Sequence, residues 1–266
     1  SAGTKEDVYE YYAGAEYLES AVFALIRRAD PFIRHTYIRG RNGFESLRRL
    51  PFPYHEMRES QYEFITEAFR TIKNSSRLLV SAPTGTGKTI SALYPAVRAI
   101  GEGHADKIFC LCSKTTVGKA FTDAAELLSH HAPLLRCAVI SSKERCCPVS
   151  GDRGMRKSKM CSTGCRFYAY ADGKCAKLRL IEGAAECLNF SVISPETIKA
   201  AAEKHCVCPH ELSLFVSEYC DIVICDYNYI FDFRIRLRRY FSDDTGERFV
   251  FLADEVHNLP KRAMDT

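Results

Sequence analysis

The sequence predicts an α/β fold in which a parallel β-sheet is covered by helices on both faces and is interrupted by a cysteine-rich insertion. Short runs that are apolar after their first residue, such as 107–112 and 248–253, alternate with stretches whose apolar residues recur at helical spacing. Uniformly apolar strands are typical of parallel sheets that are buried on both faces. This alternation breaks over residues 141–210, which hold more than half of the 13 cysteines and little strand pattern.

Length and composition favour a soluble protein with a sizeable core. The chain has 266 residues, of which 46% are hydrophobic and 26% are charged. No apolar run reaches the roughly 18 residues of a membrane span, and no signal peptide is recognisable. We therefore expect a cytoplasmic monomer without a membrane partner. In a reducing cytosol, clustered cysteines bind metal more often than they form disulfides.

Residues 1–50 are interpreted as an N-terminal helical and extended segment, of the kind that ends an upstream domain. Its amphipathic helix is predicted over 6–28, and Pro31 is expected to end it. The chain begins with Ser rather than Met, which indicates a processed or excised piece. Residues 51–266 are interpreted as one domain, with 141–210 as its insertion.

Secondary structure is predicted in chain order from residue 58 onward. The predicted helices are 58–73, the stretch after residue 89, 118–130, 211–219 and a basic stretch at 235–241. The predicted strands are 78–80, 107–112, 135–140, 221–226 and 248–253.

The stretch 77–89, RLLVSAPTGTGKT, predicts a phosphate-binding loop between the strand 78–80 and a helix. Backbone N–H groups of such a loop form an anion site together with the helix N-terminus. Lys88 is expected to reach the β- and γ-phosphates of ATP, and the Thr89 hydroxyl is expected to ligate Mg²⁺. Ala82 departs from the strict pattern, which has Gly there. The residues expected to contact the nucleotide are Pro83, Thr84, Gly85, Thr86, Gly87, Lys88 and Thr89.

An acidic pair supplies a hydrolytic partner for this loop. The apolar strand 248–253 runs directly into Asp254-Glu255-Val256-His257. Ligands of open α/β sheets bind beyond the carboxyl ends of the strands, so the loop and the acidic pair are expected at one sheet edge. Asp254 is predicted to hold Mg²⁺, and Glu255 to orient and deprotonate the attacking water. His257 would report the nucleotide state to a neighbouring surface. A solvated helix start explains the acids alone but not their pairing with the loop.

The cysteines of the insertion predict a metal centre. Four thiolates gathered from separate loops can ligate Zn²⁺ or a [4Fe–4S] cluster, and the spacing alone does not choose between them. Six other cysteines lie in apolar runs and are expected to be small core residues. These six are Cys110, Cys112, Cys137, Cys187, Cys220 and Cys225.

In this order, APTGTGKT and DEVH resemble motifs I and II of superfamily-2 helicases, and the insertion between them is similar to that of the iron–sulfur XPD/DinG group. The segments ICDYNYIFD and CPHELSLFVSEYCD look most like bacterial DinG-like helicases. The resemblance covers about residues 45–262. It implies a RecA-like motor domain, ATP hydrolysis and 5′ to 3′ translocation on single-stranded DNA.

The resemblance also implies roles for single residues. Gln61 matches the glutamine that reads adenine, and the aromatic residues of 51–54 lie where the family packs against the base. Ser113-Lys114-Thr115 matches a segment that contacts the DNA backbone, and 226–229 one that lies near the strand. The implied [4Fe–4S] ligands are Cys147, Cys161, Cys165 and Cys208, with Cys146, Cys175 and Cys206 as alternative thiols.

A basic segment surrounds the predicted ligands. Between Lys143 and Arg179 the sequence has ten basic and three acidic residues. These side chains are expected to contact DNA phosphates, although a solvated loop face explains them equally well. Phe167, Tyr168 and Tyr170 are candidates to stack on bases or to pack around the cluster.

The sequence predicts the first motor domain of an ATP-dependent DNA helicase. The chain ends soon after His257, so the second RecA-like domain, which completes the ATP site, is expected to be absent. The fragment alone is therefore expected to hydrolyse ATP weakly or not at all. The alternative is a metal-containing nucleic-acid-binding module without ATPase activity of its own.

Overall fold

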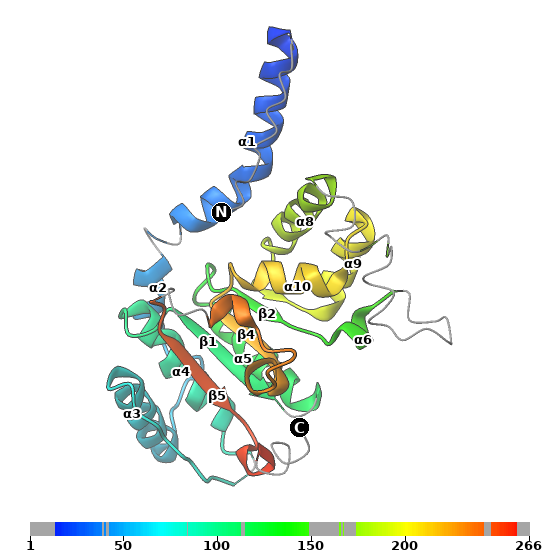
Figure 1. Ribbon diagram of the computed structural model, residues 1–266. Helices are drawn as coiled ribbons and strands as arrows, with labels where there is room; N and C mark the ends of the chain where they lie inside the picture. The colour runs from blue at the N-terminus through cyan, green and yellow to red at the C-terminus, as the bar shows by residue number, and fades with distance from the viewer. Residues whose placement is uncertain are drawn as a thin grey trace, which may run out of the picture.

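The computed structural model describes residues 14–38, 40, 43–83, 85–112, 115–148, 165, 167, 174–241 and 246–259 (Figure 1). Its centre is a parallel sheet of five strands in the order β3-β2-β4-β1-β5. These are β1 (Lys107–Cys112), β2 (Cys137–Val139), β3 (Val192–Ile193), β4 (Ile222–Asp226) and β5 (Phe249–Ala253). The strands of this sheet pair in parallel, so their carboxyl ends share one edge.

One face of the sheet is covered by helices that flank the phosphate-binding loop. These are α3 (Glu59–Lys73), α4 (Lys88–Gly101) and α5 (Thr115–Ser129). Ile108 and Cys110 of β1 pack with Leu93 and Val97 of α4 in this core. The short α2 (Phe44–Arg48) joins it, since Leu47 is buried and a Cβ on Gly101 would lie 2.2 Å from the Arg48 nitrogen. Packing of this domain thus begins before residue 51.

The opposite face is covered by later segments of the chain. Phe109 and Leu111 point to this side because side chains alternate along a strand. Over them lie α11 (Asn228–Phe231) and the 3₁₀ helix η2 (Arg238–Tyr240), and Tyr240 is buried against Phe109. A second apolar cluster joins β2 and β3 to the last helices of this face, α8 (Lys174–Cys187), α9 (Pro195–His205) and α10 (Pro209–Ser217).

The sequence located most of these elements. Strand β1 has the predicted bounds, and β4 and β5 each begin one residue later than predicted. All six cysteines predicted to be core residues are buried, which confirms that prediction. The basic stretch 235–241 is not an α-helix, because it forms a turn followed by η2. None of the described helices combines the length and hydropathy that crossing a bilayer requires.

The predicted strand 78–80 is wrong for the described sheet. These residues have no strand neighbour, and the exposed fractions of Leu78, Leu79 and Val80 are 39%, 81% and 40%. The alternation of these exposed fractions indicates an extended segment. Its backbone, however, makes no hydrogen bonds to a strand of the described sheet. An apolar run predicts a strand only where a neighbouring strand edge pairs with it, and here a cavity lies between this run and β5.

Two further differences concern the N-terminal helix and the predicted insertion. Helix α1 (Ala15–Ile38) continues through Pro31 and projects from the body in Figure 1. Packing offsets the hydrogen bond that proline removes, because Phe32 contacts Phe215 and Tyr219. Within 141–210, β3 pairs with β2, so the second half of this segment belongs to the sheet and its covering helices.

Candidate nucleotide-binding site

The loop before α4 has the geometry of an anion cradle. Gly85 and Gly87 have φ values of +79° and +82°, which glycine adopts without the Cβ penalty of other residues. Helix α4 begins at Lys88 directly after this turn. The Lys88 Nζ donates to the carbonyl oxygens of Ala82 (2.8 Å) and Pro83 (3.2 Å), and the Thr86 Oγ1 donates to Pro83 O (2.9 Å). The loop is thus folded around its own lysine.

The N-terminus of α3 holds this loop from the side. The Gln61 Oε1 accepts a hydrogen bond from the Arg58 backbone N–H at 3.1 Å, as the N3 side chain of a capping box does. Gln61 is buried, and its Nε2 would lie 2.5 Å from a Cβ on Gly87. The Arg58 guanidinium donates to Gly85 O at 3.5 Å. The residue expected to read adenine therefore contacts the phosphate-binding loop.

Replacing Gly87 with alanine is expected to lower the free energy of unfolding more than replacing Gly85. Both glycines have positive φ, which costs an L-residue about 1–2 kcal/mol. Only at Gly87 must Gln61 also move and lose its bond to Arg58, which adds about 1 kcal/mol. Urea unfolding of Gly85→Ala and Gly87→Ala measures the difference, and in a Gln61→Ala background it should disappear. Equal losses in both variants would show that Gln61 does not brace the loop.

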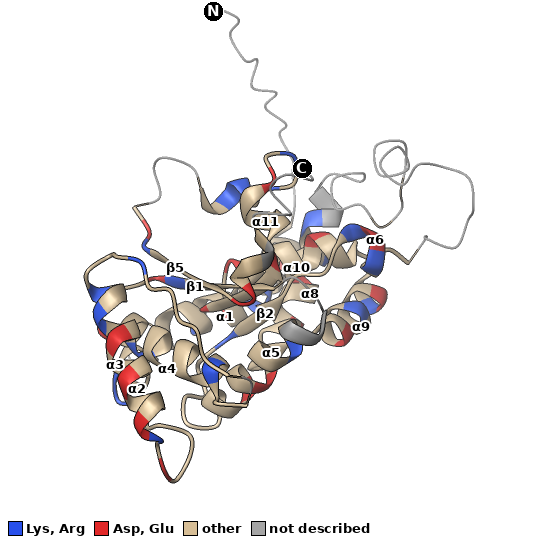
Figure 2. Ribbon diagram, turned by 90° about the horizontal axis from the view of Figure 1, so that it is seen from below, with Lys and Arg blue, Asp and Glu red and all other residues tan. Residues whose placement is uncertain are grey.

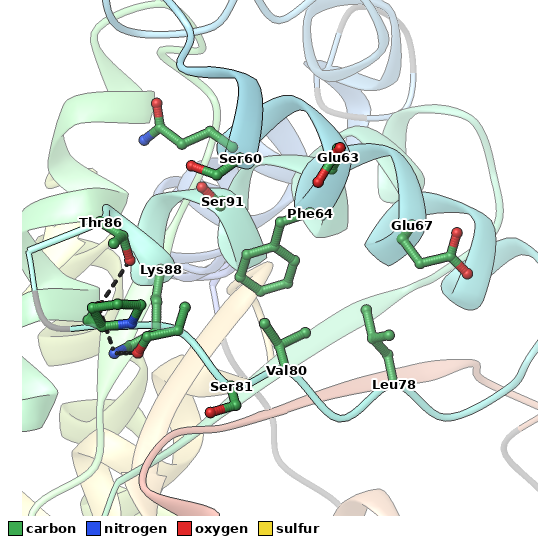
Figure 3. A pocket seen from close by; sticks show the side chains of 13 residues that line it. Ser60, Glu63, Phe64, Glu67, Leu78, Val80, Ser81, Thr86, Lys88 and Ser91 are labelled. Atoms are coloured by element: carbon green, nitrogen blue, oxygen red, sulfur yellow. Dashed lines mark hydrogen bonds between the residues drawn. The ribbon is translucent and has the colours of Figure 1, made fainter.

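Two cavities meet at Lys88. The α3 cavity, of about 430 Å³, lies between α3 and residues 78–83 and includes Gln61, Phe64 and Lys88 in its lining (Figure 3). The β5 cavity, of about 570 Å³, lies between residues 75–80 and β5. Lys88, Thr89 and Asp254 all line the β5 cavity. The fold therefore brings the end of the phosphate-binding loop and the first acidic residue after β5 to one space.

The acidic segment follows β5 in a tight turn. Asp254 N–H donates to Leu111 O at 3.2 Å, and the Tyr227 hydroxyl donates to Asp254 O, so β1 and the segment after β4 both hold this residue. Asp254 Oδ1 accepts from the Glu255 N–H at 2.9 Å. Glu255 adopts a left-handed conformation (φ +54°), and its carboxylate lies 3.3 Å from the exposed His257 ring. Glu255 and His257 lie at the surface, beside the cavity edge marked by Asp254 and Val256.

The carboxyl edge of the sheet is acidic. Cys112 of β1 lies opposite Asp226 of β4. Burial raises the pKa of the Cys112 thiol to about 12, and the nearby charges of Asp254 and Asp226 contribute to this rise. Cys112 is therefore a neutral thiol at physiological pH, and the charge at this edge is carried by the carboxylates of Asp254 and Asp226.

Sequence reasoning missed several residues of the α3 cavity. Ser91, one turn into α4, is buried, and its hydroxyl has no hydrogen-bond partner among the described residues. Glu63 and Glu67 line the same cavity from α3. Ser91 follows Lys88 by three residues, so helical spacing would have placed its side chain near the loop, because residues three or four apart share a helix face. Glu63 and Glu67 have no such spacing from Gln61.

The described cysteines of the insertion lie partly together. Cys147 and Cys165 are half-buried, and Cys208 is buried at the N-terminus of α10. Burial raises the pKa of the Cys146 thiol to about 11, and the neighbouring Cys208 contributes to this rise. No group of three metal-binding side chains gathers within the part of the chain that the structure describes. Cys161 lies outside that part.

Other predicted site residues also lie outside the described residues. They are Thr84 of the phosphate-binding loop, Ser113, Lys114, Tyr168, Tyr170 and most of the basic segment 143–179. The structure describes the other residues predicted for the nucleotide site, which are Gln61, Pro83, Gly85, Thr86, Gly87, Lys88, Thr89, Asp254, Glu255 and His257.

Comparison with known proteins identifies the family. The DEAD_2 family model matches residues 110–266, and the model of the DEAD/DEAH box helicase matches residues 61–145. The chain is 25% identical over 224 residues to the general transcription and DNA repair factor IIH helicase subunit XPD of Dictyostelium discoideum. It is 24% identical over 259 residues to regulator of telomere elongation helicase 1 of Homo sapiens.

These matches cover 78% and 80% of this chain but only 29% and 20% of the two relatives, so the chain spans less than a third of their length. A solved XPD helicase structure superposes with a TM-score of 0.54 at 18% identity, covering 78% of this chain and 34% of that one, which shows a shared fold. The resemblance to XPD-like helicases and the RecA-like fold are confirmed, whereas the closer likeness to bacterial DinG-like helicases stays a prediction. The chain belongs to the DEAD_2 family of XPD-like superfamily-2 helicases.

Proposed function

We propose that this chain is the first motor domain of an ATP-dependent DNA helicase that binds Mg–ATP at the loop before α4 and single-stranded DNA beyond the sheet edge. The observation that carries the proposal is the shared lining of the β5 cavity by Lys88, Thr89 and Asp254. A cation, a hydroxyl and a carboxylate around one space suit a magnesium-bound triphosphate. The family membership supports the same reaction. Translocation from 5′ to 3′ remains part of the proposal.

Each residue has a distinct task in the proposed site. Lys88 exchanges its bonds to Ala82 and Pro83 for bonds to the β- and γ-phosphates. Thr89 and Asp254 hold the Mg²⁺ that neutralises the phosphate charge. Glu255 orients and deprotonates the attacking water, and the His257 ring beside it carries the change of charge to the surface. Gln61 recognises adenine from the N-terminus of α3.

Binding of a fluorescent ATP analogue and of labelled oligo(dT), each titrated in Mg²⁺, tests this function. The proposal expects saturable binding of both ligands and competition of the analogue by ATP. Absence of nucleotide binding by folded protein would contradict the motor assignment. Nucleotide binding without oligo(dT) binding would contradict only its coupling to DNA.

We also propose a [4Fe–4S] cluster held by Cys147, Cys161, Cys165 and Cys208. The donor set fits a cluster chemically, because the thiols of Cys146 and Cys208 are neighbours near the N-terminus of α10 and burial disfavours their uncompensated thiolates. The cluster would tie the α10 end of the domain to residues 147–165. Lys143 lies close enough to Cys208 to lower its thiol pKa against the effect of burial.

The variant Cys147→Ser is expected to lose the cluster, whereas Cys146→Ser is expected to keep it. A serine hydroxyl is a much poorer ligand for iron than a thiolate. Iron and sulfide content and the visible absorption of anaerobically purified protein measure the outcome. Loss of the cluster in Cys146→Ser alone would identify Cys146 as the ligand, as its position beside Cys208 allows. A zinc-loaded, colourless wild-type protein would contradict the cluster itself.

A further inference from the structure

A loop on the face opposite α4 exposes aromatic side chains among arginines. We call residues 231–239, FDFRIRLRR, the aromatic–arginine loop. Phe231, Phe233 and Ile235 expose 55%, 78% and 48% of their surfaces. Exposed large apolar side chains that cluster on an ordered surface mark interaction sites more often than single ones do. The nucleotide site described above does not use this loop.

The loop is rigid, so its exposure is built into the fold. Asp232 accepts hydrogen bonds from the Arg234 backbone and guanidinium at 2.9–3.1 Å, and its own carbonyl accepts from Arg236 N–H at 2.8 Å. Leu237 is buried, and its N–H donates to Tyr229 O at 2.8 Å. The Tyr240 hydroxyl lies 2.6 Å from Ser217 Oγ and fixes the far end. Such anchoring avoids much of the entropy cost of ordering a loop on binding.

The loop is strongly basic. Its nine residues carry four arginines and one acid. Arg234 pairs with Asp232, and Arg239 pairs with Glu218 at 2.5 Å. Arg236 and Arg238 have no carboxylate partner among the described residues. The Arg236 guanidinium lies 5.8 Å from the centre of the Phe233 ring, and Arg238 donates to Phe233 O at 3.4 Å. Two positive charges thus flank the most exposed ring.

We infer that this loop is a single-stranded DNA contact in which Phe233 stacks on a base and Arg236 and Arg238 bind the adjoining phosphates. An exposed ring beside unpaired arginines is complementary to an unstacked base and its backbone. A duplex offers no free base face to such a ring. The inference rests on the proposed function and adds to it the residues that hold the strand.

The place of the loop in the fold agrees with this inference. It follows α11, which begins two residues after β4 ends at the carboxyl edge of the sheet. In Figure 2, blue segments, which mark Lys and Arg, lie next to α11. Because β1 and β4 are adjacent, with Cys112 opposite Asp226, β1 ends beside the segment that leads into this loop. A DNA strand that crosses this edge would meet the end of β1 and the aromatic–arginine loop.

Phe233→Ala is expected to weaken binding of oligo(dT) about fivefold to hundredfold, the usual range for loss of one base-stacking ring. Arg236→Ala is expected to reduce the slope of log affinity against log salt by about 0.7, the loss of one phosphate contact. The matched controls are Phe190→Ala, a half-exposed ring before β3, and Arg49→Ala, an exposed arginine paired with Glu45. Both controls should bind oligo(dT) like the wild type.

A tryptophan at the same position gives a direct readout. The chain has no tryptophan, so Phe233→Trp introduces a single fluorophore. Stacking on a base should quench its emission as oligo(dT) is added. The same titration of Phe190→Trp should leave the emission unchanged. Circular dichroism melts of each variant check that the fold is kept.

The outcomes separate this inference from the proposed function. If the wild type binds oligo(dT) but Phe233→Ala binds equally well and Phe233→Trp is not quenched, the loop does not hold the strand and the proposed function stands. If the folded wild type binds no oligo(dT), this inference and the DNA-binding part of the proposed function are overturned, whereas the nucleotide site is tested separately with the ATP analogue. Loss of affinity in Phe233→Ala, with quenching confined to Phe233→Trp, supports both.

Discussion

Replacing Lys88 with alanine is expected to weaken ATP binding at least about 100-fold while the domain stays folded. A hydrogen bond to a charged group contributes about 1.5–3 kcal/mol, and Lys88 is proposed to make two of them to the phosphates. Its Nζ already lies at the centre of the loop, held by the Ala82 and Pro83 carbonyls. Titration with a fluorescent ATP analogue in Mg²⁺ measures the loss.

Two comparisons make this expectation specific. Lys73→Ala removes an exposed lysine at the end of α3 and should leave the affinity unchanged. Lys88→Arg keeps the positive charge but places a larger, planar group in the loop, so it should restore the affinity only in part. Wild-type affinity in Lys88→Ala would mean that the nucleotide binds elsewhere.

Lys107→Met is expected to lower the free energy of unfolding by about 3 kcal/mol or more. Lys107 begins β1 and is buried, and its ammonium donates to the carbonyl oxygens of Ser217 (3.0 Å), Glu218 (3.1 Å) and Cys220. It also lies 5.4 Å from the centre of the Tyr240 ring. Methionine keeps the volume but leaves the carbonyls at the end of α10 without their donor, and each unsatisfied buried group costs about 1–3 kcal/mol.

Urea unfolding followed by circular dichroism measures this loss. Lys199→Met is the matched control, because Lys199 lies on the surface of α9 and makes only a long ion pair to Glu203 (4.0 Å). Its change should stay within about 0.5 kcal/mol. A similarly small effect of Lys107→Met would show that water can replace the ammonium at the end of α10.

The elements that sequence predicted well are those that local pattern alone determines. Strand β1 is apolar from Ile108 to Cys112, and its bounds are those predicted for the run 107–112. Gln61 falls on the first turn of α3, where the pattern placed it. The six core cysteines were predictable because five lie in strands or on an apolar helix face and Cys220 lies two residues before the apolar strand β4.

Elements that depend on distant contacts could not be predicted in this way. Helix α1 passes through Pro31 because Phe32 packs on α10 and His35 bonds to Tyr219 O at 2.8 Å, contacts that the local pattern does not show. Strand β3 has only two residues, too few for a periodicity. The run 78–80 is apolar, yet it lacks the neighbouring backbone that would make it a strand.

The candidate site likewise has features that the sequence could predict and features that it could not. Motif order and the rule for parallel sheets were sufficient to predict that Asp254 and the loop at Lys88 share one edge. The contact of Gln61 with Gly87 and the burial of the Ser91 hydroxyl could not be predicted from the sequence. Both arise where α3 crosses the start of α4, and the local pattern does not determine that crossing.

The most direct test of the central claim is the dependence of ATP affinity on Mg²⁺ in the wild type and in Asp254→Asn. If Lys88, Thr89 and Asp254 form one site, Mg²⁺ tightens ATP binding by about tenfold or more in the wild type, and Asp254→Asn loses this gain. Without Mg²⁺ the variant binds ATP no more weakly, because a carboxylate repels the phosphates. Asp226→Asn, at the same edge but outside the β5 cavity lining, should keep the gain. An equal gain from Mg²⁺ in the wild type and in Asp254→Asn would contradict the claim that the loop and the acidic segment act as one magnesium–nucleotide site.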